Sequence, residues 1–138
     1  MDHSNSRKPG VYLQEKPTDS VNIARRQEAW SRQLMENEQQ RAASEAAGLP
    51  ALCRLVEVAR RDTGQSQICG RFLLAIYNSN AFPFNLSDLR SLERTIWEDC
   101  IAVLGLDQRP RKEIHLLIKD GPAIWEELKS TWAPNRRT

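Results

Sequence analysis

The spacing of apolar residues divides the chain near Gly48. Residues 1–48 contain few large apolar side chains, whereas apolar positions recur at helical spacing from residue 49 almost to the end. We therefore expect a folded helical domain over residues 49–132, preceded by an arm over residues 1–48 and followed by a short tail over residues 133–138. A domain of about 85 residues is large enough to bury a modest core.

The arm itself has two parts. Its first 19 residues include Pro9, Gly10 and Pro17 and show no period, which is typical of disorder. From Val21 to Ala47 there is neither glycine nor proline, and most residues are good helix formers. The sequence therefore predicts a helix over about residues 21–47, although its apolar stripe is thin.

Two helices are predicted in the first half of the domain. Pro50 occupies a position where a first-turn proline is tolerated, and the apolar spacing from Leu52 indicates a helix that ends near Thr63-Gly64. Ser66 is placed to cap a second helix, Gln67–Asn78. That helix is apolar on nearly every side, so we expect it to be the central one.

A loop with Pro83 follows, and its phenylalanines, Phe82 and Phe84, are expected to fold back onto the core. Asn85 then resembles the cap of a helix that runs to Leu104 and stops at Gly105. This helix places the following residues on one face: Leu89, Leu92, Ile96, Cys100 and Val103.

The last helix is predicted after Asp120-Gly121-Pro122, with Trp125, Leu128 and Trp132 at i, i+3 and i+7. Residues 111–119 fit a helix but also alternate in part like a strand, and we favour the helix. The predicted fold class is therefore all-α: a small bundle of four to five helices with an extended or helical N-terminal arm.

Composition excludes several classes of protein. The 20 basic and 18 acidic residues give a net charge of +2, so there is no overall basic field of the kind that marks many nucleic-acid binders. No apolar run is long enough to span a membrane, and the first residues lack the apolar stretch of a secretory signal. With three cysteines, an odd number, we expect reduced thiols and a cytoplasmic location.

The cysteines, Cys53, Cys69 and Cys100, are too far apart in sequence to form a zinc-binding pair, so we expect them to act as small apolar residues. No phosphate loop, dinucleotide motif or hydrolase motif occurs, and we expect no catalytic residue, metal or cofactor. An enzyme is the least supported class, because it would depend on Glu93, His115 and a cysteine meeting in the fold.

Glu93 is the acid that stands out, because the helical wheel places it inside the apolar stripe of the predicted helix 85–104. A carboxylate there has to be paired, and Arg71 and His115 are the candidate partners. We therefore predict Glu93, Arg71 and His115 as buried polar residues, with a structural ion pair favoured over a functional acid.

Basic residues gather locally in two groups that could contact an anion or a nucleic acid. Arg90 and Arg94 stand at i and i+4, and Arg109, Arg111 and Lys112 lie at a predicted helix start, where cations oppose the macrodipole. Acidic residues are interspersed, so the ordinary interpretation is a solvated mixed-charge surface. A nucleic-acid-associated factor remains the alternative function.

The arm carries the candidate partner-binding residues Ile23, Trp30 and Leu34, which share one narrow helix face. The stripe fades after Met35, so a long coiled coil is not expected. A short apolar patch centred on tryptophan is typical of a helix that docks in a groove, on this protein's own core or on a partner protein.

The run Gly70–Asn78, followed by Phe82-Pro83-Phe84-Asn85-Leu86 and later by Glu113-Ile114-His115 and Gly121, resembles an uncharacterised bacterial domain family. We associate this family with plasmids and integrative conjugative elements of proteobacteria. The resemblance covers about residues 49–132 and implies an accessory role on a mobile element, with no catalytic residues to carry over. Our first hypothesis is therefore a non-enzymatic accessory protein that acts through protein–protein interaction.

Overall fold

The computed structural model describes the backbone of residues 4–134 and the side chains of residues 19–134, so the predicted tail lies almost entirely outside the described residues. The chain divides into two compact units, residues 1–40 (the arm unit) and residues 41–138 (the core unit).

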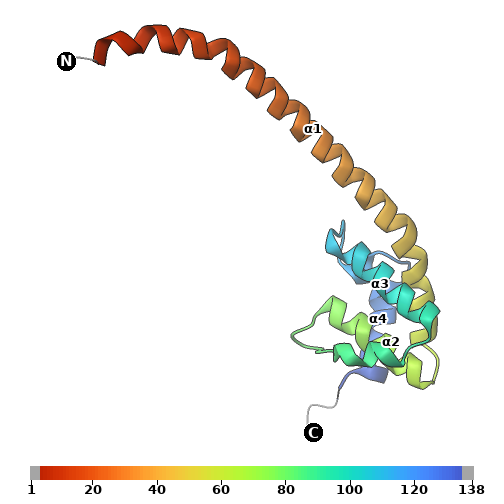
Figure 1. Ribbon diagram of the computed structural model, residues 1–138. Helices are drawn as coiled ribbons and strands as arrows, with labels where there is room; N and C mark the ends of the chain where they lie inside the picture. The colour runs from red at the N-terminus through yellow and green to blue at the C-terminus, as the bar shows by residue number, and fades with distance from the viewer. Residues whose placement is uncertain (1–3, 135–138) are drawn as a thin grey trace. The chain divides into compact units, whose positions relative to one another are not determined.

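Within residues 4–134 there are four α-helices, two 3₁₀ helices and no strand (Figure 1). In chain order these are α1 (Ser4–Ala59), α2 (Gly64–Tyr77), η1 (Leu86–Ser91), α3 (Arg94–Gln108), η2 (Ile114–Leu116) and α4 (Gly121–Trp132). The predicted all-α class is confirmed.

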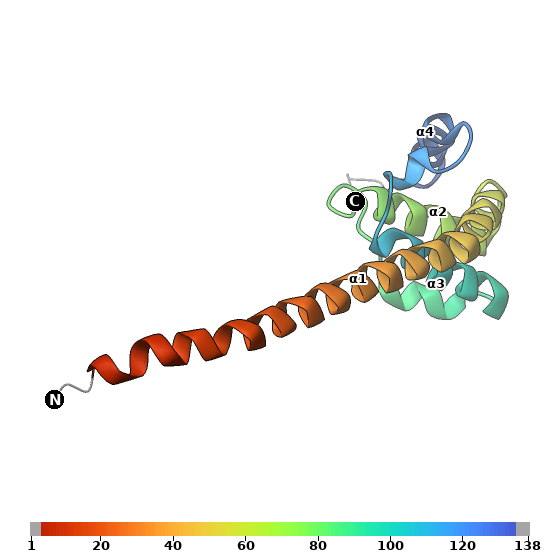
Figure 2. The same ribbon diagram turned by 90° about the horizontal axis from the view of Figure 1, so that it is seen from above.

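Helix α2 is the centre of the core unit, as its all-round apolar sequence predicts. It lies between α3 and α4 and also contacts both 3₁₀ helices (Figure 2). Phe72, Leu73 and Leu74 are buried on consecutive positions. The buried core that surrounds them includes residues of α1, α3, η2 and α4: Leu52, Leu55, Cys100, Val103, Ile114, Trp125 and Leu128. None of the helices within residues 4–134 has the length and apolar character needed to cross a membrane.

The start of α2 differs from the prediction by one turn. Thr63, not Ser66, is its N-cap: the Thr63 side chain accepts a hydrogen bond from the Ser66 backbone N–H at 3.0 Å. Ser66 lies inside the first turn, fully buried, with its hydroxyl 2.7 Å from the Thr63 hydroxyl. Two candidate caps three residues apart compete here, and the earlier one prevails because it lets the helix include one more turn of backbone hydrogen bonds.

The loop after α2 folds back onto the core, as predicted. Phe84 packs edge-on against Phe72, with ring centroids 5.7 Å apart, and Phe82 lies beside Tyr77. The predicted cap at Asn85 is also confirmed, because its side chain accepts from the Ser87 backbone N–H at 3.1 Å.

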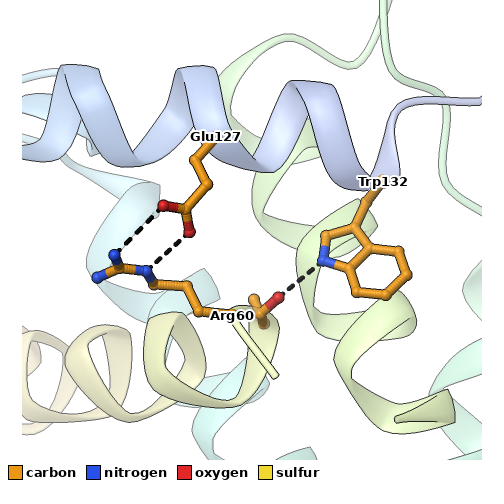
Figure 3. Close-up of polar contacts among 4 residues, drawn as sticks. Arg60, Glu127 and Trp132 are labelled. Carbon is orange, nitrogen blue, oxygen red and sulfur yellow. Dashed lines mark hydrogen bonds and ion pairs between the residues drawn. The ribbon is translucent and has the colours of Figure 1, made fainter. Parts of the chain in front are cut away.

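The end of α1 is fastened to α4 by two contacts (Figure 3). The indole Nε1 of Trp132 donates a hydrogen bond of 2.7 Å to the Ala59 carbonyl, one of the last carbonyls of α1, which has no partner within the helix. One residue on, the Arg60 guanidinium forms a fork-like ion pair with Glu127, with nitrogen–oxygen distances of 2.8 and 3.3 Å. Side chains of α4 thus close the C-terminal end of α1.

The helix break predicted at Gly48-Leu49-Pro50 is absent, because α1 continues through it to Ala59. Gly48 serves close packing: a Cβ there would lie 2.6 Å from the Leu106 Cβ on α3. Pro50 costs one backbone hydrogen bond, but the buried residues immediately after it, Ala51 and Leu52, hold the helix in place. The disorder predicted for residues 1–19 is likewise not found from Ser4 on, where the backbone is helical.

The single helix predicted from Asn85 to Leu104 is in fact two elements. Leu92 and Glu93 are extended, with ψ of 148° and 152°, and separate η1 from α3. The Gln65 side chain accepts a 2.7 Å hydrogen bond from the Glu93 backbone N–H, which compensates for the break. At the other end Gly105 does not stop α3, which runs on to Gln108, because a glycine inside a helix costs only about 1 kcal/mol.

The helix favoured for residues 111–119 is reduced to η2, whose first residue, Ile114, is buried. The reversal before α4 explains why. Asp120 adopts the left-handed conformation (φ 60°), and a Cβ on Gly121 would collide with the His115 carbonyl oxygen. A continuous helix could not make this close turn, whereas the predicted start of α4 at Asp120-Gly121-Pro122 is confirmed.

The position of Phe72 predicts a large loss of stability on truncation. Phe72→Ala should lower the free energy of unfolding by about 3–5 kcal/mol, because it leaves a cavity beside Phe84 in the centre of the core. Leu86→Ala is the matched control, since Leu86 is 73% exposed and its loss should change stability by no more than about 0.5 kcal/mol. Urea unfolding followed by circular dichroism measures both, and equal effects would contradict the placement of α2.

The two contacts in Figure 3 should differ in strength. Trp132→Phe removes the hydrogen bond to Ala59 and leaves a carbonyl unpaired, so we expect a loss of about 1–2 kcal/mol. Arg60→Ala breaks an ion pair whose partners are both about half exposed, which should cost about 0–1 kcal/mol. Thermal unfolding of the two variants tests this order, and a larger loss for Arg60→Ala would reverse it.

Candidate interaction surfaces

The arm unit exposes the apolar stripe that the sequence predicts. Trp30 is 65% exposed, and Ile23 and Leu34 are each 50% exposed on the helical backbone of α1. Their spacing places all three on one face within about three turns. The stripe is accordingly accessible, while its predicted role in binding a partner stays a prediction.

The core unit has a second exposed apolar face, which sequence reasoning missed. Helix α3 buries Cys100, Val103 and Leu106 on its inner side. On the outer side Trp97, Ile101 and Leu104 stand at i, i+4 and i+7, and the last two are 43% and 42% exposed. The spacing of Trp97, Ile101 and Leu104 can be seen in the sequence. It was overlooked because the inner stripe by itself already gives an amphipathic helix its one apolar face.

A pocket of about 400 Å³ lies where η1 meets the start of α3, and we name it the η1–α3 pocket. Its lining is mostly apolar, and the only charged residues in it are two arginines that the sequence analysis singled out. The lining residues are Leu86, Leu89, Arg90, Leu92, Arg94 and Trp97. Arg90 and Arg94 thus line the same pocket as four apolar residues.

The two arginines are engaged differently. The Arg94 guanidinium lies over the Trp97 ring, 4.9 Å from its centroid, and its Nε is 3.3 Å from the Glu98 carboxylate. Arg90 is exposed and makes no ion pair with any residue in the described part of the chain. One cation of the pocket is therefore free to pair, and the other is held by an exposed, weak ion pair.

The second basic group, Arg109, Arg111 and Lys112, is separate from the first. It follows the C-terminal end of α3, about 20 Å along the helix from Arg94. The prediction that these cations oppose a macrodipole is wrong, since at the end of a helix they stabilise it. Arg111 also forms an ion pair with Glu45 of α1.

The predicted cluster of buried polar residues does not form. Glu93 is exposed, because the chain is extended at this position and its side chain leaves the apolar stripe on which the prediction rested. Arg71 is half-buried and donates through Nε to the Trp132 carbonyl at 3.1 Å, not to Glu93. His115 is half-buried with its ring edge-on to Tyr77, centroids 4.9 Å apart, and its buried Nδ1 has no hydrogen-bond partner.

The family of the chain follows from comparison with known proteins. Residues 49–133 match a family of unknown function, DUF7673. The chain belongs to this family. The match confirms the uncharacterised domain family expected from the resemblance, over nearly the same residues. No curated protein and no solved structure shows significant similarity to the chain.

The prediction that the cysteines act as small apolar residues holds for two of the three cysteines of the DUF7673 domain and is wrong for Cys53. Cys69 on α2 and Cys100 on α3 are fully buried, whereas Cys53 is exposed. A hydrogen bond with Cys69 is the main reason why the pKa of Cys100 is raised, and burial raises it further. The sequence could not show this pairing, because 31 positions separate the two residues and only the packing of α2 on α3 brings them together.

The residues on which an enzyme hypothesis depends are not assembled in the DUF7673 domain. His115 makes no hydrogen bond to Glu93 or to a cysteine within the described residues. Among the same residues no group of three histidine, cysteine or acidic side chains is close enough to hold a metal ion.

Thiol reactivity tests the placement of the cysteines. In the native protein one thiol, Cys53, should react promptly with a thiol reagent, because Cys69 and Cys100 are inaccessible and hydrogen-bonded to each other. In denaturant all three should react. Cys53→Ser should abolish the prompt reaction, whereas prompt labelling of two or more thiols in the native protein would contradict the burial of the α2–α3 pair.

Proposed function

We propose that this protein is a non-enzymatic accessory protein that acts by binding another protein through its arm. The observation that carries the proposal is the exposure of Trp30 between Ile23 and Leu34 on one face of α1. Apolar side chains gathered on one face, with a tryptophan among them, are typical of an interaction site, because single scattered ones are normal on a surface but a row is not.

Tryptophan has physical advantages at such a site. It buries a large apolar area on binding while only two side-chain torsions are frozen, which is why it is enriched among the residues that dominate binding energies. A stripe only about three turns long fits the docking of one helix in a groove better than a long coiled coil, which needs several sustained heptads.

The biological setting is proposed on the resemblance described for residues 49–132. The resemblance supports a proposed setting on a plasmid or an integrative conjugative element, in the cytoplasm of a bacterium. Reduced thiols fit this compartment, because Cys53 is exposed and the chain has an odd number of cysteines. Sequencing the DNA on both sides of the gene in its native host tests the setting, since genes of conjugation or plasmid maintenance are expected there.

Nucleic-acid binding is the alternative function, and the position of the arginines argues against it. Arg90 and Arg94 lie at one end of α3, while Arg109–Lys112 lie beyond the other end, so the two groups do not merge into one basic surface. Arg111 is partly neutralised by Glu45. A gel-shift titration against salt addresses the alternative directly, because salt-sensitive binding of DNA or RNA is the signature of phosphate contacts.

The arm proposal predicts that Trp30→Ala abolishes capture of the partner protein without affecting stability. The full-length variant and the wild type are compared in affinity pull-downs from the native host, with bound protein and nucleic acid identified together. Val21→Ala is the matched control, because Val21 is 49% exposed and lies on the opposite face of the helix from Trp30. We expect it to retain the partner.

Melting temperatures separate binding from folding in this experiment. Both variants should melt within a few degrees of the wild type, since both side chains are largely exposed. A marked drop for Trp30→Ala would mean that the stripe belongs to the fold. Equal retention of the partner by both variants, or capture of nucleic acid alone, would refute the arm as the protein-binding site.

A further inference from the structure

The η1–α3 pocket and the outer face of α3 form one continuous apolar surface. Trp97 belongs to both, because it lines the pocket and begins the row that continues through Ile101 and Leu104. At the other side of the pocket Leu86 is 73% exposed, the highest value among the exposed large apolar side chains of residues 19–134. Leu86, Ile101 and Leu104 are exposed and are not among the side chains packed against the core, so core packing does not account for their apolar character.

The charges around the pocket define the chemistry that would complement it. Arg90 and Arg94 are its only charged lining residues, and Arg90 makes no ion pair among the described residues. The Arg94–Glu98 pair is exposed on both sides, with relative exposures of 78% and 57%, so it is worth little and a carboxylate from a ligand can replace it. The pocket therefore favours a ligand that combines apolar groups with carboxylates.

The aromatic content of the pocket argues for a peptide over a nucleic acid. Sites for single-stranded nucleic acids stack bases on open aromatic faces. Here Trp97 is the only aromatic lining residue, and the Arg94 guanidinium already lies over its ring at 4.9 Å. The rest of the apolar lining is three leucines, which suit aliphatic or aromatic side chains of a protein rather than stacked bases.

We propose that this surface binds an acidic amphipathic helix of a partner protein. Apolar side chains at i, i+4 and i+7 of that helix would enter the η1–α3 pocket and lie along Ile101 and Leu104, while its carboxylates pair with Arg90 and Arg94. Because α3 is 15 residues long, a ligand helix of about 15 residues matches it. This site is distinct from the arm stripe and does not depend on the function proposed for the arm.

A random peptide library tests the chemistry of the ligand without assuming its identity. Peptides of roughly 16 residues displayed on phage are selected against the full-length protein. We expect the selected sequences to have a net negative charge and apolar residues at helical spacing. Selection of basic or uncharged peptides, or no enrichment at all, would overturn the proposal.

The best selected peptide is then titrated against single variants by fluorescence anisotropy. Arg90→Glu and Leu86→Ala should each weaken binding by about tenfold or more, because they remove a charged and an apolar contact of the pocket. Arg109→Glu makes the same charge change beyond the far end of α3 and should leave the affinity within about twofold. Equal losses for Arg90→Glu and Arg109→Glu would mean that binding is only a net-charge effect.

Three further measurements complete the experiment. A peptide in which lysine replaces each acidic residue should bind Arg90→Glu better than wild type, which a misfolded variant could not do. Trp30→Ala should bind the acidic peptide like the wild type, so failure of the arm site and failure of this site are distinguishable. An oligothymidylate that binds more tightly than the peptide, and loses affinity in Arg90→Glu, would assign the pocket to nucleic acid instead and refute the proposal.

Discussion

Burial of α2 is the constraint on which the core unit depends. This helix has apolar residues on nearly every side, so a stable fold must cover each of its faces. Helices α3 and α4 and both 3₁₀ helices contact it, and the buried end of α1 joins the same core. Each element that covers α2 then needs only one apolar face. In α4, for example, Trp125 and Leu128 are buried, while Glu127 lies on the outer side and forms an ion pair with Arg60. The amphipathic helices around α2 are thus a consequence of its composition.

The parts of the fold that periodicity reports directly could be predicted from the sequence. The central position of α2, the start of α4 and the return of Phe84 to the core follow from which residues must be buried. The boundaries of the helices were harder to predict, because they depend on contacts between residues that are far apart in the sequence. The break at Leu92-Glu93 is compensated by Gln65, and the uninterrupted α1 depends on Gly48 meeting Leu106. The local sequence does not distinguish a glycine that ends a helix from a glycine that allows another helix to pack closely against it.

The same break explains what was missed in the candidate sites. A single helix over residues 85–104 assigns Leu89, Leu92 and Cys100 to one buried stripe and draws Glu93 into it. Once the chain is extended at Leu92-Glu93, the phase of α3 is set independently, and Glu93 becomes solvated. The outer row of Trp97, Ile101 and Leu104 then remains as an apolar face of its own. The arm stripe, by contrast, was predictable because no glycine or proline interrupts the helix between Val21 and Ala47.

The arm stripe and the surface formed by the η1–α3 pocket and the outer face of α3 have similar residue types but differ in charge. Each combines one tryptophan with aliphatic residues at helical spacing, and each includes side chains that stay exposed, such as Leu34 on the arm and Ile101 and Leu104 on α3. The arm has seven basic and seven acidic side chains over residues 1–48, so it presents no net charge to a partner. The η1–α3 pocket has arginines as its only charged lining residues. In the two interactions that we propose, apolar contact gives affinity while charge discriminates between partners. We therefore expect the η1–α3 pocket to select its ligand by charge, and the arm to depend on shape and apolar area.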